Sequence, residues 1–461
     1  MNDADTIDPR YAVDAVGLRT TRLLHAGLSR LDPETLEPIP YLARSWRWLD
    51  PVTLRIELRE DVTFHSGRAF TSSDVVATLE AFASPAVASR HARVIEPIAR
   101  VVADGEHAVV ITLKRPHATL LTDLELPILR ADEAALKPSP LLVFDNLGPF
   151  ALAHFARGEI KLVPRAHGPL PEPARAITIR TVHDENARAL RLLGGRSDVE
   201  LNVLSPALLP ALAKEKDVRI TARPGANLTY LVMRVDRPPL ADVARRRAIS
   251  LAIDREAITT NMLAGYAHPA TTLLPEGHWA WTAAPPATAF DPLAARALLA
   301  PSGPLHVTLL TSTDRLRIAI ARVIAQQLGE VGVTAEVTPL ELGTMIARLN
   351  AGDFDAAILQ IPELAEPNVL RVFLHGTYVP PNGSNRGRVR DPEVDRLLDA
   401  GDAALEKDAR RAIYTQLEAR LRDQLYIVPL WHEDQVAVTT MRAAAFRPSA
   451  EGRWLSLAAL K

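Results

Sequence analysis

The sequence predicts an α/β fold arranged as two lobes, and two observations support this prediction. The chain has 461 residues, which is more than one hydrophobic core usually holds and suits two or three domains. Strands and helices are expected to alternate in two separate series, which begin at residues 176 and 306. Such alternation is typical of parallel sheets covered by helices. Because the connections within each series are local, the two series need not share one sheet.

The chain that precedes the first series is rich in expected strands. Residues 46–49 and 53–58 predict a hairpin around an intervening Asp-Pro turn. Residues 71–74 (TSSD) are typical of a capping box and predict a helix that ends near Phe82. Alternating apolar residues predict a further strand over residues 107–113.

The two α/β series and the chain end follow in order. The first series has expected strands at 176–182, 198–203 and 218–222, with helices at 185–193 and 206–214. The second has expected strands at 306–310, 334–339 and 355–359, with helices at 314–329 and 342–349. Asp291 and Asp391 each precede a proline, and an N-cap acceptor followed by proline predicts a helix start. The last strands are expected at 427–430 and 436–440.

Composition narrows the classes of function. The net charge of −2 gives no general attraction to nucleic acid or to anionic membranes. The chain has no cysteine, which excludes disulfides, thiolate metal sites and cysteine nucleophiles. No apolar run is long enough to predict a membrane-spanning helix. The first residues do not resemble a secretory leader, so the sequence is either cytosolic or a processed form.

A search for catalytic chemistry gives only weak candidates. The sequence has no glycine-rich phosphate loop, no G-x-S-x-G elbow and no H-E-x-x-H motif. Residues 432–434 (HED) offer metal ligands, but neighbours on a turn rarely converge on one ion, so a solvated turn is expected. The basic triplet 245–247 and the pair Glu418 and Arg422 are expected on solvent-facing sides of helices. We therefore predict no enzyme, no metal site and no cofactor.

Several short segments resemble one known family. Residues 40–46 (PYLARSW), 58–67 (LREDVTFHSG) and 70–76 (FTSSDVV) are similar to motifs of the peptide/nickel-type substrate-binding proteins of ABC importers, the family 5 solute-binding proteins. Further similar segments follow in the same order, at 147–150 (LGPF), 252–258 (AIDREAI), 265–267 (GYA), 274–279 (LPEGHW) and 391–395 (DPEVD). Their shared order over nearly the whole chain makes the resemblance specific.

The resemblance implies a periplasmic-binding-protein-like fold, in which two lobes close over a ligand by a hinge and the first lobe carries an extra strand-rich subdomain. The expected division places lobe I at 1–30, 150–232 and 429–461, the extra subdomain at 31–149, and lobe II at 233–428. It also implies a periplasmic or cell-surface protein that captures a short peptide or peptide-like solute. Its partner would be an ABC transporter permease, and the protein itself a monomer.

The resemblance further suggests where the ligand binds. In the family's peptide binders the ligand lies as an added strand between the lobes, and an acidic residue three positions before an acidic residue and a proline pairs with its amine. Residues 363–367 (ELAEP) carry that spacing, so Glu363 is the expected anchor, and Gln360 and Ile361 directly precede it. The family usually has Asp there, so the longer Glu363 side chain moves the carboxylate outward. An exposed loop carboxylate is the alternative interpretation.

Other candidate contacts depart from the family pattern or are less specific. Residues 24–28 (LHAGL) resemble a family segment with Glu at the position of Ala26, beside His25. Arg234 stands near a position where the family commonly has Asn. The aromatic candidates, which are more often packing residues than ligand contacts, are Trp279, Trp281 and Trp431.

A last candidate segment is the run at residues 385–388 (NRGR), which is similar to a family loop near the ligand cleft. It contributes Asn385 and Arg388. Arg388 could donate two hydrogen bonds to a ligand carboxylate, and an exposed position ahead of the helix cap at Asp391 is the alternative.

Three other functions remain open from the sequence. The same fold could serve as a ligand-sensing domain, because no leader is visible. It could also bind a sugar, a metal chelate or haem, since fold does not fix function. A hydrolase on this scaffold would need a nucleophile and a base in a recognisable motif, and none is found.

Overall fold

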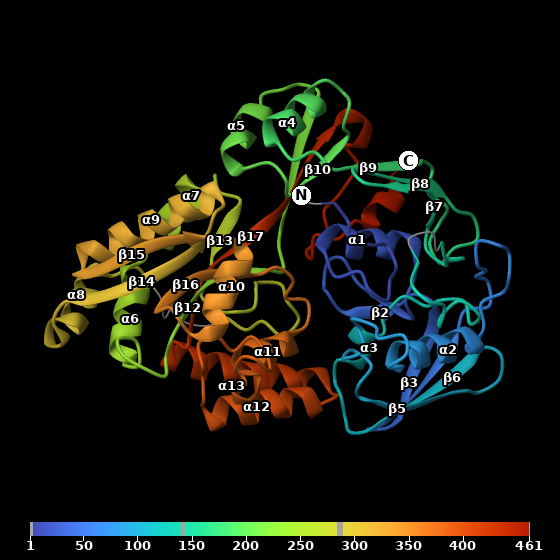
Figure 1. The fold of residues 1–461 in the computed structure, drawn as a ribbon, viewed down its shortest axis with the longest axis horizontal. Helices are drawn as coiled ribbons and strands as arrows, with labels where there is room; N and C mark the ends of the chain where they lie inside the picture. Colours follow the sequence, from blue (N-terminus) through green and yellow to red (C-terminus); the bar gives the residue numbers. More distant parts are fainter. Residues whose placement is uncertain (1–2, 140–142, 284–288, 461) are drawn as a thin grey trace. The chain divides into compact units, whose positions relative to one another are not determined.

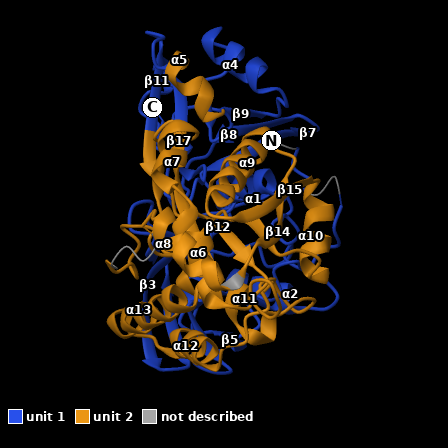
Figure 2. Cartoon of the chain, turned by 90° about the vertical axis from the view of Figure 1, so that its left-hand side faces the viewer, with its two compact units in different colours: residues 1–204, 213–221, 437–461 blue, residues 205–212, 222–436 orange. Residues whose placement is uncertain are grey.

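The computed structural model describes residues 3–139, 143–283 and 289–460 (Figure 1). The chain divides into two compact units (Figure 2). Unit 1 comprises residues 1–204, 213–221 and 437–461, and unit 2 comprises residues 205–212 and 222–436. Each unit contains sheets, helices and apolar cores of its own, which confirms the predicted two-lobed α/β class. The finer division of the first lobe into a lobe and a subdomain stays a prediction.

The first part of unit 1 is an antiparallel sheet with one long helix. The strand order is β3-β4-β6-β5, with β3 at Ala43–Asp50, β4 at Thr53–Leu58, β5 at Ile98–Ala103 and β6 at Ala108–Leu113. The predicted hairpin is thus the pair β3 and β4. Helix α2 (Ser72–Ala83) begins where the capping box predicts, since Thr71 N donates to Asp74 Oδ2 at 3.0 Å.

A second sheet of unit 1 packs with the two ends of the chain. It has the order β7-β8-β9, with β7 at Phe150–Ala156, β8 at Glu159–Pro164 and β9 at Ile177–Arg180. Its core includes Leu23 of helix α1 (Ala15–Leu24) and Trp454, next to the short helix η6 (Leu455–Ala459). The smaller elements of unit 1 are β1 (Ser29–Leu31), β2 (Pro38–Pro40), α3 (Leu120–Asp123) and η5 (Met441–Ala443).

The parallel sheet predicted from the first α/β series does not form among the described residues. Helix α4 (Glu185–Leu193) is present, but β9 pairs antiparallel with β8, and β10 (Val199–Leu201) pairs antiparallel with β17 (Ile427–Thr440). Strand β11 (Val218–Pro224) also pairs with β17. The expected helix at 206–214 is two short turns, η1 (Pro206–Leu208) and α5 (Leu209–Leu212). The preceding strand β8 and the distant strand β17 therefore take the edges that a local crossover would have used.

The second α/β series forms the centre of unit 2 as predicted. β14 (Leu305–Ser312) pairs in parallel with both β15 (Val333–Leu340) and β16 (Ala356–Ile361). Helices α9 (Arg315–Glu330) and α10 (Leu342–Ala351) connect these strands. Strand β12 (Leu228–Met233) joins antiparallel between β16 and β17. One apolar core of unit 2 includes residues of α9, and another includes residues of α10.

The remaining elements of unit 2 surround this sheet. They are α6 (Val243–Ala252), α7 (Arg255–Asn261), β13 (Ala267–Pro269), α8 (Pro292–Leu299), η2 (Ala300–Ser302), η3 (Pro367–Val369), α11 (Leu370–Leu374), η4 (Gly376–Tyr378), α12 (Pro392–Ala403) and α13 (Lys407–Gln424). The predicted starts of α8 and α12 are confirmed, because Asp291 accepts from Ala294 N and Asp391 accepts from Glu393 N.

Three predictions of solvated segments are wrong. Residues 432–434 are part of the continuous strand β17, in which His432 and Glu433 are bonded to Asn227. The guanidinium of Arg246 is buried and donates to Gln424 O at 2.6 Å. The carboxylate of Glu418 is also buried. In each case a distant backbone group supplies the partner that water was expected to supply.

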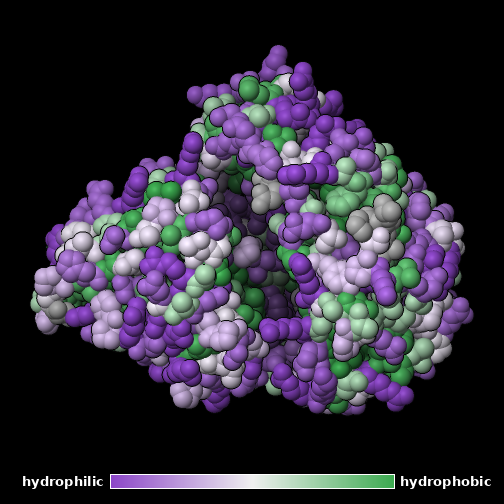
Figure 3. Space-filling view, in the orientation of Figure 1, coloured by the Kyte–Doolittle hydropathy of each residue, from purple (hydrophilic) through white to green (hydrophobic). Residues whose placement is uncertain are grey.

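The visible surface has the character expected for contact with water. Figure 3 shows one face on which hydrophilic side chains predominate and hydrophobic ones are scattered. Within the described residues, no helix is both long and apolar enough to cross a membrane.

Candidate functional site

The candidate site lies at the carboxyl ends of two parallel strands of unit 2. β14 and β16 are hydrogen-bonded neighbours, with Leu309 opposite Ala356 and Leu310 opposite Ala357. From β14 the chain continues through α9 to β15 on one side, whereas β16 lies on the other side of β14. The chain connections therefore run to opposite sides of the sheet at the boundary between β14 and β16. Open α/β sheets bind their ligands at such switch points.

Hydroxyl and amide groups gather at this switch point. Thr311 and Ser312 end β14, and their hydroxyl oxygens are buried without a hydrogen-bond partner among the described residues. Near the end of β16, Gln360 Oε1 accepts a hydrogen bond of 3.0 Å from Nη2 of Arg317 in the first turn of α9. A buried polar group without a partner costs about 1–3 kcal/mol. The two hydroxyls are therefore suited to a ligand that supplies polar partners.

Glu363 lies just beyond the end of β16, and the structure places it half-buried. The residues that follow it are tied to other elements of unit 2. Leu364 N donates to Ala226 O at 2.6 Å, and the ring of His278 is hydrogen-bonded through Nε2 to Ala365 O at 3.1 Å. A loop held by such backbone contacts presents its side chains in a defined position. The loop that carries Glu363 is therefore supported by other elements of unit 2.

A buried ion pair holds the far end of the same loop. Arg410 of α13 donates to the carboxylate of Glu366, and its Nε donates to Gly401 O at 3.2 Å. Its guanidinium lies 4.8 Å from the ring centre of Trp279 and 5.8 Å from that of Tyr414. Burial disfavours the charge on Arg410, but the carboxylate of Glu366 and the hydroxyl of Tyr414 together outweigh burial, so the pKa of Arg410 is raised. The pair stays ionised and anchors the loop.

The aromatic candidates are placed in the cores of unit 2. Trp279 packs against Arg410, and Trp281 is partly buried against the same core. Trp431 of β17 is buried, and its Nε1 donates to Glu433 Oε1 at 3.3 Å. These three side chains contribute packing, as does Ile361, which lies opposite Leu228 in β12.

Asn385 is fully buried and fastens the loop between α11 and α12. Its Nδ2 donates to the carbonyls of Leu374, His375 and Val389 at 3.2, 3.1 and 2.9 Å. Its Oδ1 accepts from Val389 N at 2.9 Å. The side chain thus satisfies backbone groups of its own loop, which gives it a positioning role.

The two arginine candidates are also engaged by the protein. Arg388 has a left-handed backbone with φ of 59°, and its Nη2 donates to the carbonyls of Asn350 and Ala351 at 3.2 and 3.3 Å. Arg234 is buried, and its Nε donates to Asp236 Oδ1 at 2.8 Å. Arg388 thus fixes the end of α10, and Arg234 connects that end, through Gly352 O, with the start of the chain after β12.

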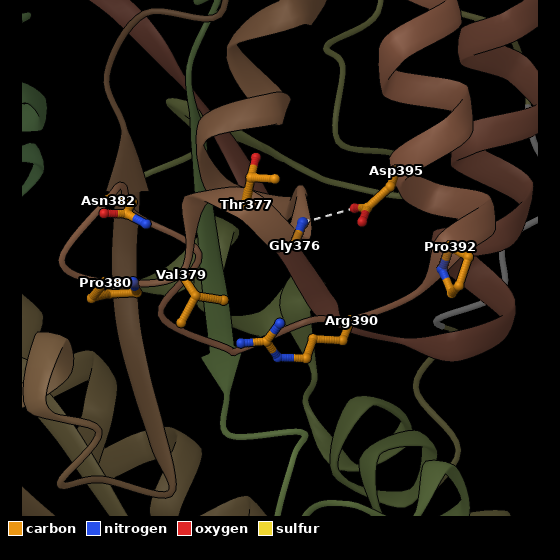
Figure 4. A pocket seen from close by; sticks show the side chains of 8 residues that line it. All are labelled: Gly376, Thr377, Val379, Pro380, Asn382, Arg390, Pro392 and Asp395. Carbon is orange, nitrogen blue, oxygen red and sulfur yellow. Dashed lines mark hydrogen bonds between the residues drawn. The ribbon is translucent and has the colours of Figure 1, made fainter.

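A depression of about 560 Å³ lies next to the loop that carries Asn385 (Figure 4). It is lined by Gly376, Thr377, Val379, Pro380, Asn382, Arg390, Pro392 and Asp395. Gly376 N donates to Asp395 Oδ1 at 2.7 Å, which is the dashed line in the figure. The backbone therefore already engages this carboxylate, while Asn382 and Arg390 are exposed at the rim.

The remaining two candidates belong to unit 1. Ala26 is in the apolar core, and its carbonyl accepts from Ile128 N at 2.9 Å. His25 is buried with its ring edge-on to that of Phe144, 5.9 Å between centres. Burial lowers the pKa of His25 to about 4, although Asp8 opposes the shift. His25 is therefore neutral at physiological pH.

Several residues of the site were not predicted from the sequence. Thr311, Ser312 and Arg317 belong to it because β14 ends beside β16 and α9 begins there. A strand end followed after one residue by an N-cap residue, here Asp314, is the signal that could have found them. No group of three or more His, Asp or Glu residues within the described ranges is arranged to hold a metal ion.

Comparison with known proteins links these features to one family. The family model described as bacterial extracellular solute-binding proteins, family 5 Middle, matches residues 37–369. Among curated proteins, a probable di/tripeptide-binding protein 5 of Pseudomonas aeruginosa is 27% identical over 463 residues, covering 90% of this chain and 85% of that protein. The glutathione-binding protein GsiB of Escherichia coli is 28% identical over 361 residues, covering 75% and 69%.

Solved structures share the fold. NikA from Brucella suis, in complex with Fe(III)-EDTA, has a TM-score of 0.88 at 20% identity and covers 99% of this chain and 97% of its own. The oligopeptide-binding protein AppA from Bacillus subtilis, in complex with a nonapeptide, has a TM-score of 0.79 at 19% identity, with 98% and 95% covered. These likenesses confirm the predicted periplasmic-binding-protein-like fold.

Proposed function

We propose, from the premise that this chain belongs to the bacterial extracellular solute-binding proteins of family 5, that it captures a short peptide or peptide-like solute and delivers it to an ABC importer. The curated relatives named for di- and tripeptides and for glutathione support a small peptide ligand. The protein binds its ligand outside the cytoplasm and releases it to a permease. The protein performs no chemistry on its ligand and acts as a monomer.

The observation that carries this proposal is the supported carboxylate at the switch point. Glu363 follows β16, and the residues after it are tied to Ala226, which precedes β12, to His278 and to Arg410. A fixed carboxylate pairs with a ligand ammonium more strongly than a mobile one, because less freedom is lost on binding. The buried hydroxyls of Thr311 and Ser312 add donors and acceptors for a peptide backbone.

The mechanism follows from these groups. The ligand amine pairs with Glu363, and its backbone lies as an added strand whose hydrogen bonds tolerate different side chains. Exclusion of water from the bound ligand then strengthens the ion pair. The closed, ligand-bound state is the one that a permease would recognise, so ligand binding shifts the population toward it.

Replacing Glu363 with glutamine is expected to weaken the binding of a free-amine tripeptide by about 1.5–3 kcal/mol, the contribution of a hydrogen bond to a charged group. Glutamine keeps the shape of the side chain but cannot pair with an ammonium. Isothermal titration calorimetry on the wild type and Glu363→Gln measures the difference.

Two controls make this test specific. The exposed Glu336 of β15 is a matched site, and Glu336→Gln should leave the affinity unchanged. The N-acetylated tripeptide should bind the wild type and Glu363→Gln equally. If the acetylated and the free-amine peptides bind the wild type with the same affinity, Glu363 is not the amine anchor.

A further inference from the structure

A second cavity lies wholly within unit 1 and shares no residue with the switch point of unit 2. Its volume is about 400 Å³, within the range of small-ligand sites. It is bordered by β9, β10, helix α4 and the C-terminal segment that includes Phe446 and Trp454. Nothing in the proposed capture of a solute by Glu363 uses this cavity.

The cavity is bordered by the backbone edges of two strands. Residues 175–180 and 197–201 line it without interruption, whereas a single face of a strand would contribute only every second residue. Within the described part of the chain, β9 pairs only with β8, and β10 pairs only with β17. Each strand therefore turns an unpaired row of backbone groups toward the cavity, the feature that recruits an added strand.

Arg188 of α4 holds these two edges apart at one end. Its Nη1 donates to Val182 O at 2.6 Å, just beyond β9, and its Nη2 donates to Val203 O at 2.5 Å, just beyond β10. The guanidinium of Arg188 thus bridges the backbone just beyond the ends of the two strands. The hydrogen bonds of Arg188 therefore hold this end of the cavity in place within unit 1.

The lining has an apolar part and a basic part. Ile177 and Ile179 of β9 and Val199 and Leu201 of β10 pack on the core that contains Trp454. Because side chains alternate along a strand, the residues between them point away from that core. The basic residues of the lining are Arg175, Arg180, Arg188, Arg191, Arg196 and Arg442.

Only two carboxylates oppose these arginines in the lining. Asp198 pairs with Arg442 at 2.9 Å, and Glu200 accepts from Ser197 Oγ at 2.6 Å. Arg180 pairs with Glu159 at 2.6 Å. Arg191 donates to Arg196 O at 3.3 Å, and the charges of Arg188 and Arg191 favour the ionised form of Glu200. The cavity is thus strongly basic in a chain whose net charge is −2, which favours an anionic occupant.

We propose that this cavity binds an extended peptide segment in which apolar and acidic residues alternate, as an added strand between β9 and β10. In such a strand one face is apolar and meets Ile177, Ile179 and Trp454, and the other face is acidic and meets Arg191 and Arg196. The peptide backbone pairs with the open edges of both strands.

The test uses the full chain and a tetrapeptide blocked at both ends, acetyl-Val-Glu-Leu-Glu-amide. Because the probe has no free amine, it does not depend on the site of Glu363, and Glu363→Gln should bind it as the wild type does. Calorimetry should show saturable binding that weakens when salt is raised from about 50 to about 200 mM, because salt shortens the Debye length and screens the arginine charges. Hydrogen exchange should show protection of residues 176–181 and 198–203 on binding.

Charge reversal provides the decisive comparison. Arg191→Glu combined with Arg196→Glu should lower the affinity at least about tenfold, because two repulsive contacts replace two attractive ones. Arg47→Glu, at an exposed residue of β3, makes the same kind of change elsewhere in unit 1 and should have no effect. If circular dichroism shows that the double variant does not fold, Arg196→Gln, which alters a single exposed side chain, should still weaken binding about threefold.

Four results would overturn the proposal. They are absence of binding to the wild type, equal binding of acetyl-Val-Lys-Leu-Lys-amide, unchanged affinity in the arginine variants, and binding of decanoate in place of the peptide. The last of these would assign the cavity to a small amphiphilic anion. Loss of tripeptide capture in Glu363→Gln with intact binding of the blocked probe would support both sites independently.

Discussion

Replacing Arg410 with alanine is expected to lower the free energy of unfolding of unit 2 by about 3–5 kcal/mol, because the carboxylate of Glu366 is then left buried without its partner. Arg410 and Glu366 have side chains exposed by only 8% and 15%, so water cannot replace the lost cation. The substitution also removes the packing of the guanidinium on Trp279. Chemical denaturation followed by circular dichroism measures the change.

Two comparisons isolate the burial of this pair. Arg396 and Glu393 form an exposed pair at 2.7 Å on α12, and Arg396→Ala should cost less than about 1 kcal/mol. Replacing both buried partners, as Arg410→Met with Glu366→Leu, should recover much of the stability lost in Arg410→Ala, since no uncompensated charge remains. If Arg410→Ala costs no more than Arg396→Ala, the pair does not anchor the loop.

Replacing Glu418 with glutamine is expected to abolish a pH dependence of stability. Burial raises the pKa of Glu418 to about 7 from an ordinary value of 4.5, although hydrogen bonds from Leu274 N and Leu273 N and the charge of Arg422 oppose the shift. The folded protein keeps this proton at a pH where the unfolded chain has lost it. The stability that the protonated Glu418 contributes to the folded protein is therefore complete below about pH 4.5 and is lost as the pH rises through about 7.

The size of this effect follows from the pKa difference. Above pH 7 the ionised carboxylate costs the folded state about 3 kcal/mol. Glutamine retains the oxygen that accepts from Leu273 N at 2.9 Å and from Leu274 N at 3.2 Å, and it does not ionise. Glu418→Gln should be more stable than the wild type at pH 8 and similar at pH 4.5. A constant difference between the two proteins across this range would show that Glu418 titrates normally.

The fold was predictable where the decisive interactions are local. Asp291 and Asp391 mark helix starts because each side chain bonds a backbone group two or three residues ahead. The series at β14, β15 and β16 is correct because its crossovers are short. The pairing of β9 and β10 was predicted wrongly, since each strand is taken by an antiparallel partner that sequence patterns cannot identify.

The site was predictable only in part, for the same reason. The family resemblance suggested Glu363 through the spacing of residues 363–367 (ELAEP), and its role as the ligand anchor stays a proposal. Other contacts join residues that are far apart in the sequence. Arg410 pairs with Glu366, and Glu418 accepts from the backbone of Leu273. The Glu418 and Arg422 spacing suggested a solvated helix face, yet the spacing does not say which side of α13 is covered. Burial, and with it the raised pKa of Glu418, is visible only in the folded chain.

The central claim, that this chain captures short peptides through a fixed carboxylate, is tested most directly by calorimetric titration of the purified protein with a panel of free-amine di- and tripeptides and their N-acetylated counterparts. We predict saturable binding of at least one free-amine peptide at a ratio of one to one, and much weaker binding of the acetylated form. Absence of binding to every peptide of the panel, together with tight binding of a sugar or a metal chelate, would contradict the account.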